Sequence, residues 1–339
     1  MRVDRAARVI ASVTLRTLLR RGFALIAVLA GTLAGGTVAV TNGGAVRQTG
    51  AGPAAAGCIT ETSVGDHTFN CNCNGLRVDA RVPSACVRPG CGLILELHGD
   101  TGTGLLEDAH VKLRDLGVRD GYIVVAPTGP AIGREELGST WSSSNDAALV
   151  DIVRQFARAY RTDAKRVHVT GFSRGGFVTW RLACDHADLF ASAAPAGAST
   201  GADRGERTCF AAGRAPSRKI PLLLLMGRTD AAVGYPLIVA IRDAAIANYG
   251  TTQSETIAGD STYTHTRWTS ADGAVIEAFD HSYATVADGP WGFARGHCFP
   301  GSTTDPYARQ YALPCKPPNT FVWGEEVMRF FRAHPMPQG

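Results

Sequence analysis

Short apolar runs that end in glycine or proline turns alternate with helical patterns along most of this chain, and this alternation constrains the fold most strongly. Such runs are typical of buried parallel strands, which need no polar positions because both faces of the sheet are covered. The predicted strands are 92–98, 122–126, 166–170, 190–195 and 220–226. Apolar residues at helical spacing predict helices over 149–160, 175–187, 236–249 and 323–331. The sequence therefore predicts an α/β fold, with a mostly parallel central sheet flanked by helices.

Late in the chain the pattern changes to a β-hairpin. The runs 264–270 and 274–279 flank the turn Ala271-Asp272-Gly273. We expect this hairpin to be appended to the alternating pattern. Hydrophobic residues make up 45% of the 339 residues and charged residues 19%. This composition excludes a disordered chain and is enough for one sizeable core.

Residues 1–45 are typical of a secretory signal peptide. An uncharged stretch of 18 residues, 23–40, follows a basic segment and precedes small residues. The pair Arg20-Arg21 resembles the twin-arginine export pattern. The alternative is an uncleaved membrane anchor, for which 18 residues are short. We expect 46–57 to be a linker and 58–339 to form the folded domain.

Positive charge gathers in the signal segment. It holds six arginines against one aspartate, whereas the whole chain has a formal net charge of +4, so the remainder is close to neutral. A near-neutral domain offers no general electrostatic footprint for nucleic acid. We therefore expect an exported protein, extracellular or periplasmic, with no nucleic-acid partner and no stable membrane span after processing.

Nine cysteines in an exported chain predict disulfides. Five of them precede residue 92, and their pairing stays open: Cys58, Cys71, Cys73, Cys86 and Cys91. The last four could in principle bind zinc, because cysteine is a common zinc ligand. Their spacing is not that of a standard zinc site, and export favours oxidation. We therefore expect no metal. The segment before Cys58 resembles a lipoprotein box, which leaves lipidation as an alternative there.

The segment Gly171-Phe172-Ser173-Arg174-Gly175 lies where a predicted strand ends and a predicted helix begins. This is the G-x-S-x-G pattern of a nucleophile elbow, in which the serine occupies a strained backbone position and the glycines avoid collisions with neighbouring elements. The alternative is a helix-capping serine in a glycine-rich turn. The strand–turn–helix setting favours Ser173 as a nucleophile.

A serine nucleophile needs a base that is oriented by an acid, and in this fold the chain order is serine, acid, histidine. Asp230 follows the strand 220–226 and is the candidate acid; His297, in a Gly/Pro-rich loop before the last helix, is the candidate base. The rival acids are Asp260, Asp272 and Asp280, and the rival bases are His265, His281 and His334.

Two backbone N–H groups are needed to hold the oxyanion. One is the amide of Arg174, after the nucleophile, and the other comes from Asp100 or Thr101 in the loop after the strand 92–98. A carboxylate at position 100 would repel the oxyanion unless it points away. We therefore expect the Asp100 side chain to bind nearby backbone.

These motifs together resemble the polyhydroxybutyrate depolymerase and feruloyl esterase group of α/β-hydrolases. The matching segments are LHG at 97–99, WSSSND at 141–146, GFSRGG at 171–176, WRLAC at 180–184, Asp230 and GHCFPG at 296–301. The resemblance covers about 75–333. Many polymer depolymerases add a polymer-binding module that this sequence lacks, so crystalline polymer is not the expected substrate. The five early cysteines also depart from the group's pattern.

The resemblance implies further features of the site. It implies disulfides Cys184–Cys209 and Cys298–Cys315, the second of which would clamp the loop of His297. Trp141, Phe172 and Trp291 are candidates for lining an acyl or aromatic pocket. Ordinary core packing is the alternative for all three.

The sequence thus predicts an exported serine hydrolase that cleaves carboxylic esters through an acyl-enzyme. The expected catalytic residues are Ser173, Asp230 and His297, without a metal or organic cofactor. The expected substrates are polyester oligomers or feruloyl or acetyl esters. A peptidase or amidase on the same fold and a catalytically inactive surface-binding protein are the alternatives.

Overall fold

The computed structural model describes residues 57–71, 75–133, 138–200, 209–210, 213–286, 295–304 and 313–337. These residues belong to one unit, which runs from Pro53 to Gly339. The predicted signal segment and most of the predicted linker lie outside the described residues.

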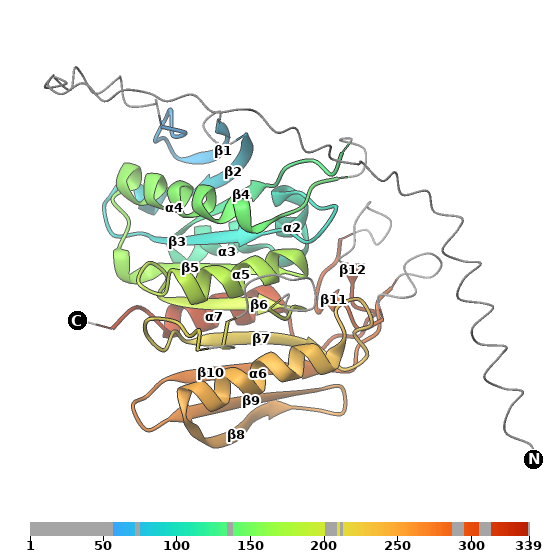
Figure 1. The fold of residues 1–339 in the computed structure, drawn as a ribbon. Coiled ribbons are helices and arrows are strands. Elements are labelled where there is room, and N and C mark those ends of the chain that lie inside the picture. Colours follow the sequence, from blue (N-terminus) through green and yellow to red (C-terminus); the bar gives the residue numbers. More distant parts are fainter. Residues whose placement is uncertain are drawn as a thin grey trace, which may run out of the picture. The chain divides into compact units, whose positions relative to one another are not determined.

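A ten-stranded sheet passes through this unit in the order β1-β2-β4-β3-β5-β6-β7-β10-β9-β8 (Figure 1). The strands are β1 (Gly65–Cys71), β2 (Leu76–Val82), β3 (Gly92–Leu97), β4 (Tyr122–Thr128), β5 (Val167–Phe172), β6 (Ser192–Ala196), β7 (Leu222–Gly227), β8 (Thr251–Gly259), β9 (Tyr263–Ser270) and β10 (Val275–His281). The block from β4 to β10 is parallel. Antiparallel pairs extend it at both edges.

Helices cover both faces of the sheet. They are α2 (Gly104–Val111), α3 (Leu113–Asp120), α4 (Asp146–Tyr160), α5 (Arg174–Asp185), α6 (Tyr235–Tyr249) and α7 (Trp323–Ala333). Figure 1 shows α4, α5 and α6 in front of the sheet, with α3 and α7 behind it. The strand residues alternate between the two layers: Leu93 and Leu95 pack in the cluster of α4 to α6, whereas Ile94 packs in the cluster of α7. The chain therefore has the predicted α/β-hydrolase architecture.

Each strand and helix predicted from the alternating pattern is present, with ends that differ by a few residues. The predicted late hairpin is present as β9 and β10. β10 pairs in parallel with β7, with Ile276 opposite Leu222, so the hairpin continues the central sheet. The apolar runs and helical patterns do not predict β1, β2, β8, α2 and α3. The two helices have eight residues each, too few for a clear helical period.

Disulfides close three loops among the described residues: Cys86–Cys91, Cys184–Cys209 and Cys298–Cys315. Cys86 and Cys91 are therefore bonded to each other and do not offer thiolates to a zinc ion. Cys58 is also disulfide-bonded, which leaves its sulfur no valence for a lipid. Cys73 and the side chain of Cys71 lie outside the described residues.

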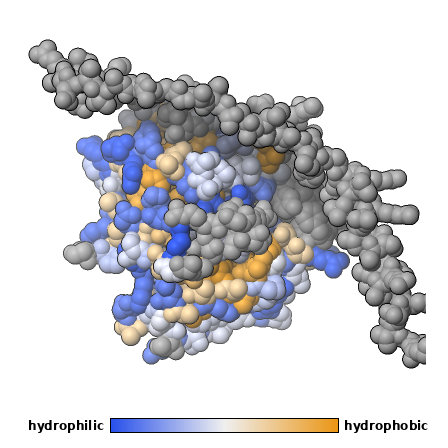
Figure 2. Space-filling model, viewed as in Figure 1, coloured by the Kyte–Doolittle hydropathy of each residue, from blue (hydrophilic) through white to orange (hydrophobic). Residues whose placement is uncertain are grey.

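The described surface is mixed in polarity. Hydrophobic and hydrophilic side chains alternate over much of the face in Figure 2, and hydrophobic ones gather over the N-terminal part of α6. Leu237 of that helix is 42% exposed. In the part of the chain that the structure describes, no helix combines the length and apolarity needed to cross a membrane.

Candidate active site

Ser173 lies between β5 and α5 in a backbone conformation that L-residues rarely adopt. Its φ is 52° and its ψ is −118°. Its amide donates to the carbonyl of Ala196 on the neighbouring strand at 2.9 Å. Strain of this kind costs of order 1–3 kcal/mol and is held by surrounding structure, typically at functional sites. The turn thus presents Ser173 at the carboxyl end of the parallel strands.

The glycines of the G-x-S-x-G motif have a steric role. A Cβ at Gly175 would lie 2.0 Å from the carbonyl oxygen of Leu97, and one at Gly171 would lie 2.6 Å from the same atom. Leu97 ends β3, so the elbow packs directly on the backbone of that strand. Any larger side chain at either position would push the elbow away from β3.

Asp230 and His297 form a buried pair. His297 Nδ1 lies 2.7 Å from Asp230 Oδ2, and both side chains are fully buried. The other oxygen of Asp230 accepts from the amides of Ala232 and Val233 at 2.9 and 3.0 Å. Burial raises the pKa of Asp230, but the interactions with His297 and these two amides outweigh it, so the pKa is lowered overall. Asp230 is therefore a carboxylate at neutral pH.

This pairing sets the tautomer of His297. A carboxylate cannot donate a hydrogen bond, so the proton between the two residues belongs to Nδ1 of His297. The other ring nitrogen, Nε2, has no hydrogen-bond partner among the described residues. An imidazole in this state can accept a proton at Nε2 and share the resulting positive charge with Asp230.

Two glycines allow the loop of His297 to lie close to the loop of Asp230. A Cβ at Gly227 would lie 2.0 Å from the carbonyl oxygen of Gly296, and one at Gly296, whose φ is +70°, would lie 2.7 Å from the amide nitrogen of Asp230. The amide of Ala231 also donates to the carbonyl of Arg295 at 3.1 Å. These contacts fix the two loops against each other. Gly296 belongs to the matching segment GHCFPG, but nothing in the sequence pattern assigned a steric role to it or to Gly227.

The disulfide Cys298–Cys315 holds the same loop on its other side. It joins β11 (Cys298–Phe299) to the residue that follows β12 (Leu313–Pro314). The two short strands pair in parallel. Because Cys298 follows His297 directly, this bridge restrains the backbone of the candidate base, as the resemblance implied.

The His297 ring packs beside the elbow. Its centroid lies 4.5 Å from that of Phe172, the residue before Ser173. A Cβ at Gly197 would lie 3.1 Å from His297 Cε1, and the residue before it, Ala196, accepts the Ser173 amide. Gly197 thus leaves room for the ring. The three candidate catalytic residues thus lie at the carboxyl ends of β5, β6 and β7.

The rival acids have other partners. Asp280 accepts from the Tyr235 hydroxyl and from Arg228. Asp260 accepts from Thr262, and Asp272 from Lys219.

Two of the rival histidines also have other contacts. His265 interacts with Glu277 at 2.9 Å, and His334 packs on the ring of Phe330. His281 is buried without a hydrogen-bond partner among the described residues.

The two candidate donors after β3 differ. The Thr101 amide donates to the carbonyl of Ser139 at 2.8 Å, so it is occupied. The amide of Asp100 therefore remains the candidate for the second donor. The Asp100 carboxylate accepts from the hydroxyl of Thr140, a side chain, whereas backbone was the expected partner. Arg174 opens α5, where the helix dipole favours negative charge.

A buried network supports this loop. His98 Nδ1 lies 2.7 Å from the carbonyl of Gly99, and Nε2 accepts from the amide of Gly129 at 2.9 Å. The Trp141 indole N–H donates to the carbonyl of His98, and Arg174 donates to the carbonyl of Trp141. Burial lowers the pKa of His98 to about 4, so its ring is neutral near pH 7.

The prediction of a substrate pocket lined by Trp141 and Phe172 is wrong for these two side chains in this structure. Each is only 1% exposed. Trp141 packs on His98, and Phe172 packs between the rings of His297 and Phe299. They support the site from behind. Trp291 lies outside the described residues.

Comparison with known proteins relates this arrangement to esterases. No protein-family model matches the chain. A bifunctional acetylxylan esterase/xylanase of Neocallimastix patriciarum is 29% identical over 150 residues, which are 43% of this chain and 20% of the relative. Acetylxylan esterase A of Aspergillus ficuum is 29% identical over 112 residues, 30% of this chain and 35% of the relative. Poly(3-hydroxyalkanoate) depolymerase C of Paucimonas lemoignei is 28% identical over 135 residues, 38% of this chain and 32% of the relative.

The matched segments thus span about a third or less of the relatives' own length. Among solved structures, an acetyl xylan esterase from Aspergillus awamori aligns over 80% of this chain and 99% of its own, with a TM-score of 0.55 and 19% identity. At that identity the likeness shows the fold. The fold is therefore that of an α/β-hydrolase, and in sequence the chain is similar to esterases and to a depolymerase.

Proposed function

We propose that this chain is a serine hydrolase of carboxylic esters. Ser173 Oγ attacks the ester carbonyl while His297 Nε2 takes the serine proton, and Asp230 holds the imidazolium. The amides of Arg174 and Asp100 stabilise the oxyanion. The proton then passes to the departing alcohol, which leaves an acyl group on Ser173. Water, deprotonated by His297, releases the acid.

The observation that carries this proposal is the Asp230–His297 pair beside the elbow. The 2.7 Å contact orients the ring, and Nε2 is left without another partner among the described residues. Ser173 is held at a φ of 52° on the adjoining turn. A capping or packing role for Ser173 would not account for a buried, oriented imidazole at the same strand ends.

The relatives point to the class of ester. Their names describe esterases of acetylated xylan and a depolymerase of poly(3-hydroxyalkanoate). Both classes present an ester on a polymer or oligomer. The hydrophobic surface over the start of α6, which begins five residues after Asp230, supports contact with a substrate that is partly apolar. We therefore propose short acyl esters on an oligomeric alcohol or acid as substrates.

We also propose that the protein works after export. The disulfides Cys86–Cys91, Cys184–Cys209 and Cys298–Cys315 fit an oxidising compartment. Residues 1–45 would be removed as the signal peptide. Residues 58–339 would then form the catalytic domain.

A turnover panel tests the proposed function. The panel contains p-nitrophenyl acetate and butyrate, acetylated xylan, methyl ferulate, amorphous poly(3-hydroxybutyrate) and a peptide p-nitroanilide. We expect ester turnover that Ser173→Ala lowers by about 10⁴–10⁶-fold. Ser254→Ala, on the exposed face of the edge strand β8, is the matched control and leaves turnover unchanged. Turnover of the anilide above that of every ester would instead support a peptidase.

A further inference from the structure

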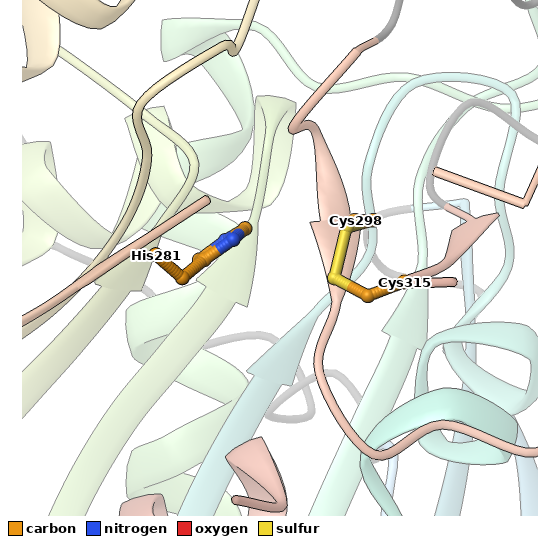
Figure 3. Close-up of side chains that lie close together, drawn as sticks. All are labelled: His281, Cys298 and Cys315. Carbon is orange, nitrogen blue, oxygen red and sulfur yellow. A yellow bond between two sulfur atoms is a disulfide. The ribbon is translucent and has the colours of Figure 1, made fainter. Parts of the chain in front are cut away.

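A histidine and a disulfide that the proposed mechanism does not use lie together beside the site. Figure 3 shows the ring of His281, at the end of β10, directed toward the bridge Cys298–Cys315. One ring nitrogen and the two sulfurs lie within 4.8 Å of one another. Each of the three side chains is at most 1% exposed.

The His281 ring is unusual because it is buried and its polar nitrogens are not hydrogen-bonded to any described residue. Most buried polar side chains are paired, so such a group calls for an explanation. Burial lowers the pKa of His281 to about 4, so the ring is neutral near pH 7 and keeps a lone pair for a ligand. The aromatic face of Tyr283 stacks on the ring at 5.3 Å and does not use that lone pair.

We propose that reduction of Cys298–Cys315 converts this cluster into a binding site for a thiophilic d¹⁰ cation such as Zn²⁺, held by both thiolates and one His281 nitrogen. In the oxidised protein the sulfurs are bonded to each other, and the site does not exist. The metal site is thus conditional on the redox state. It does not depend on the proposed esterase activity.

The chemistry balances in two steps. A dithiol gives two electrons and two protons to the disulfide, becomes a cyclic disulfide itself and leaves two cysteine thiols. Zn²⁺ then displaces the two thiol protons and forms two Zn–S bonds, while His281 adds one Zn–N bond without releasing a proton. Two sulfurs and one imidazole are a ligand set that zinc prefers over magnesium or calcium.

The His281 nitrogen already lies near both sulfurs, whereas the two sulfurs are bonded to each other and must move apart once the bridge is reduced. Zinc binds sulfur at about 2.3 Å and imidazole nitrogen at about 2.0–2.1 Å, so tetrahedral ligands lie about 3.5–4 Å apart. The ligand atoms already lie within 4.8 Å. The bound ion would join β10 to β11 and to the segment after β12, and it would replace the lost bridge as a clamp.

The test uses the full chain. The protein is reduced with excess dithiothreitol, freed of reductant without oxygen and dialysed against Zn²⁺, with Mg²⁺ as the control ion. Bound metal per chain and the thermal midpoint are then measured. We expect the reduced wild type to bind one Zn²⁺ more than the double variant Cys298→Ser/Cys315→Ser, and Zn²⁺ to raise the midpoint of the wild type alone.

Two further variants sharpen the result. His281→Gln should weaken this Zn²⁺ site by at least about tenfold, because one ligand is lost. The double variant Cys86→Ser/Cys91→Ser removes a disulfide that has no part in the cluster, and it should keep the site. The oxidised wild type contains Asp230 and His297 unchanged and should lack this Zn²⁺ site.

Several results would overturn the proposal. One is equal Zn²⁺ binding by the reduced wild type and Cys298→Ser/Cys315→Ser. Another is unchanged affinity in His281→Gln. A third is a Cys298–Cys315 bridge that stays oxidised, by mass mapping, in dithiothreitol that reduces Cys86–Cys91. If His281→Gln does not fold, the comparison of the two double-cysteine variants still decides.

Discussion

The elbow of Ser173 and the loop of His297 are held in place by different kinds of structure. The elbow depends on neighbours in sequence: β5 ends, a strained serine follows and α5 begins within a few residues. The His297 loop depends on residues far away in the chain, since its partner Asp230 lies 67 positions earlier. One half of the candidate site is therefore encoded locally and the other half by tertiary contacts. The two halves should respond differently to substitution.

The largest effect that separates the two halves is expected at Asp230, in the half that depends on tertiary contacts. Asp230→Asn should fold normally but lose about 10⁴-fold in kcat, because an amide does not hold the Nδ1–H tautomer of His297. The measurement is kcat on a p-nitrophenyl ester together with a circular dichroism melt. Asp280→Asn is the matched control, because Asp280 contacts Tyr235 and Arg228 instead. A nearly normal Asp230→Asn beside an inactive Asp280→Asn would show that the wrong acid was chosen.

The next largest effects are expected from two glycine substitutions, one in each half of the candidate site. Gly175→Ala places a Cβ 2.0 Å from a backbone oxygen of β3 and should destabilise the fold by about 3 kcal/mol or more. Gly296→Ala displaces the His297 loop and should lower kcat more than it lowers stability.

Urea unfolding and kcat measured on both variants check this. Gly121 has a φ of +72°, close to the +70° of Gly296, and nothing lies within 4 Å of a Cβ added there, so Gly121→Ala should cost only about 1 kcal/mol. Equal loss of stability in Gly175→Ala and Gly121→Ala would contradict the steric argument.

Loss of the bridge beside His297 should have a somewhat smaller effect. In oxidised protein, Cys298→Ser/Cys315→Ser should reduce the free energy of unfolding by about 3 kcal/mol through chain entropy. Removing Cys184–Cys209 should cost a similar amount, since it closes a loop of comparable length. Only the loss of Cys298–Cys315 should also lower kcat at temperatures well below the unfolding midpoint. An identical response of kcat to both pairs would argue against a clamp on the His297 loop.

The smallest expected effect lies away from both halves, in the ion pairs of β10. The buried Glu277 is bonded to His265, Arg267 and Arg329, and although burial raises its pKa, these partners lower it to about 2. In the unfolded chain a glutamate has a pKa of about 4.3. The stabilisation of the fold by ionised Glu277 is therefore present above that pH and is lost as the pH falls toward 2. We expect a loss of about 2 kcal/mol, since both arginines are partly exposed.

Unfolding in urea between pH 2.5 and 7 measures this loss. Glu277→Gln should flatten the acid limb of the curve. A limb that is unchanged in Glu277→Gln would assign the acid sensitivity to other carboxylates.

The same contrast explains what the sequence could predict. Continuous apolar runs identified the strands β3 to β7, because strands that are buried on both faces are mostly apolar. The polar edge strand β8, with several exposed residues, carries no such signal. Gly171 and Gly175 were predictable because the motif repeats a local geometry. The steric roles of Gly227 and Gly296 were not predictable. A side chain at either position would collide only because two loops that are distant in the sequence touch in the fold.

The aromatic residues show the limit in another way. Phe172 lies within the elbow motif, and Trp141 begins another segment of the resemblance. Both positions favoured the prediction that these side chains line a substrate pocket. Their side chains instead fill the space behind His98 and His297. Sequence gives nearness to the site, whereas the direction of a side chain follows from packing.

The central claim is that Ser173 is a nucleophile activated by His297. The most direct measurement is labelling with a fluorophosphonate, followed by mass mapping of the adduct. We predict one adduct, on Ser173, with labelling abolished in Ser173→Ala and strongly slowed in His297→Gln. Labelling at another residue, or a Ser173→Ala variant that keeps more than a tenth of the esterase activity, would contradict the account.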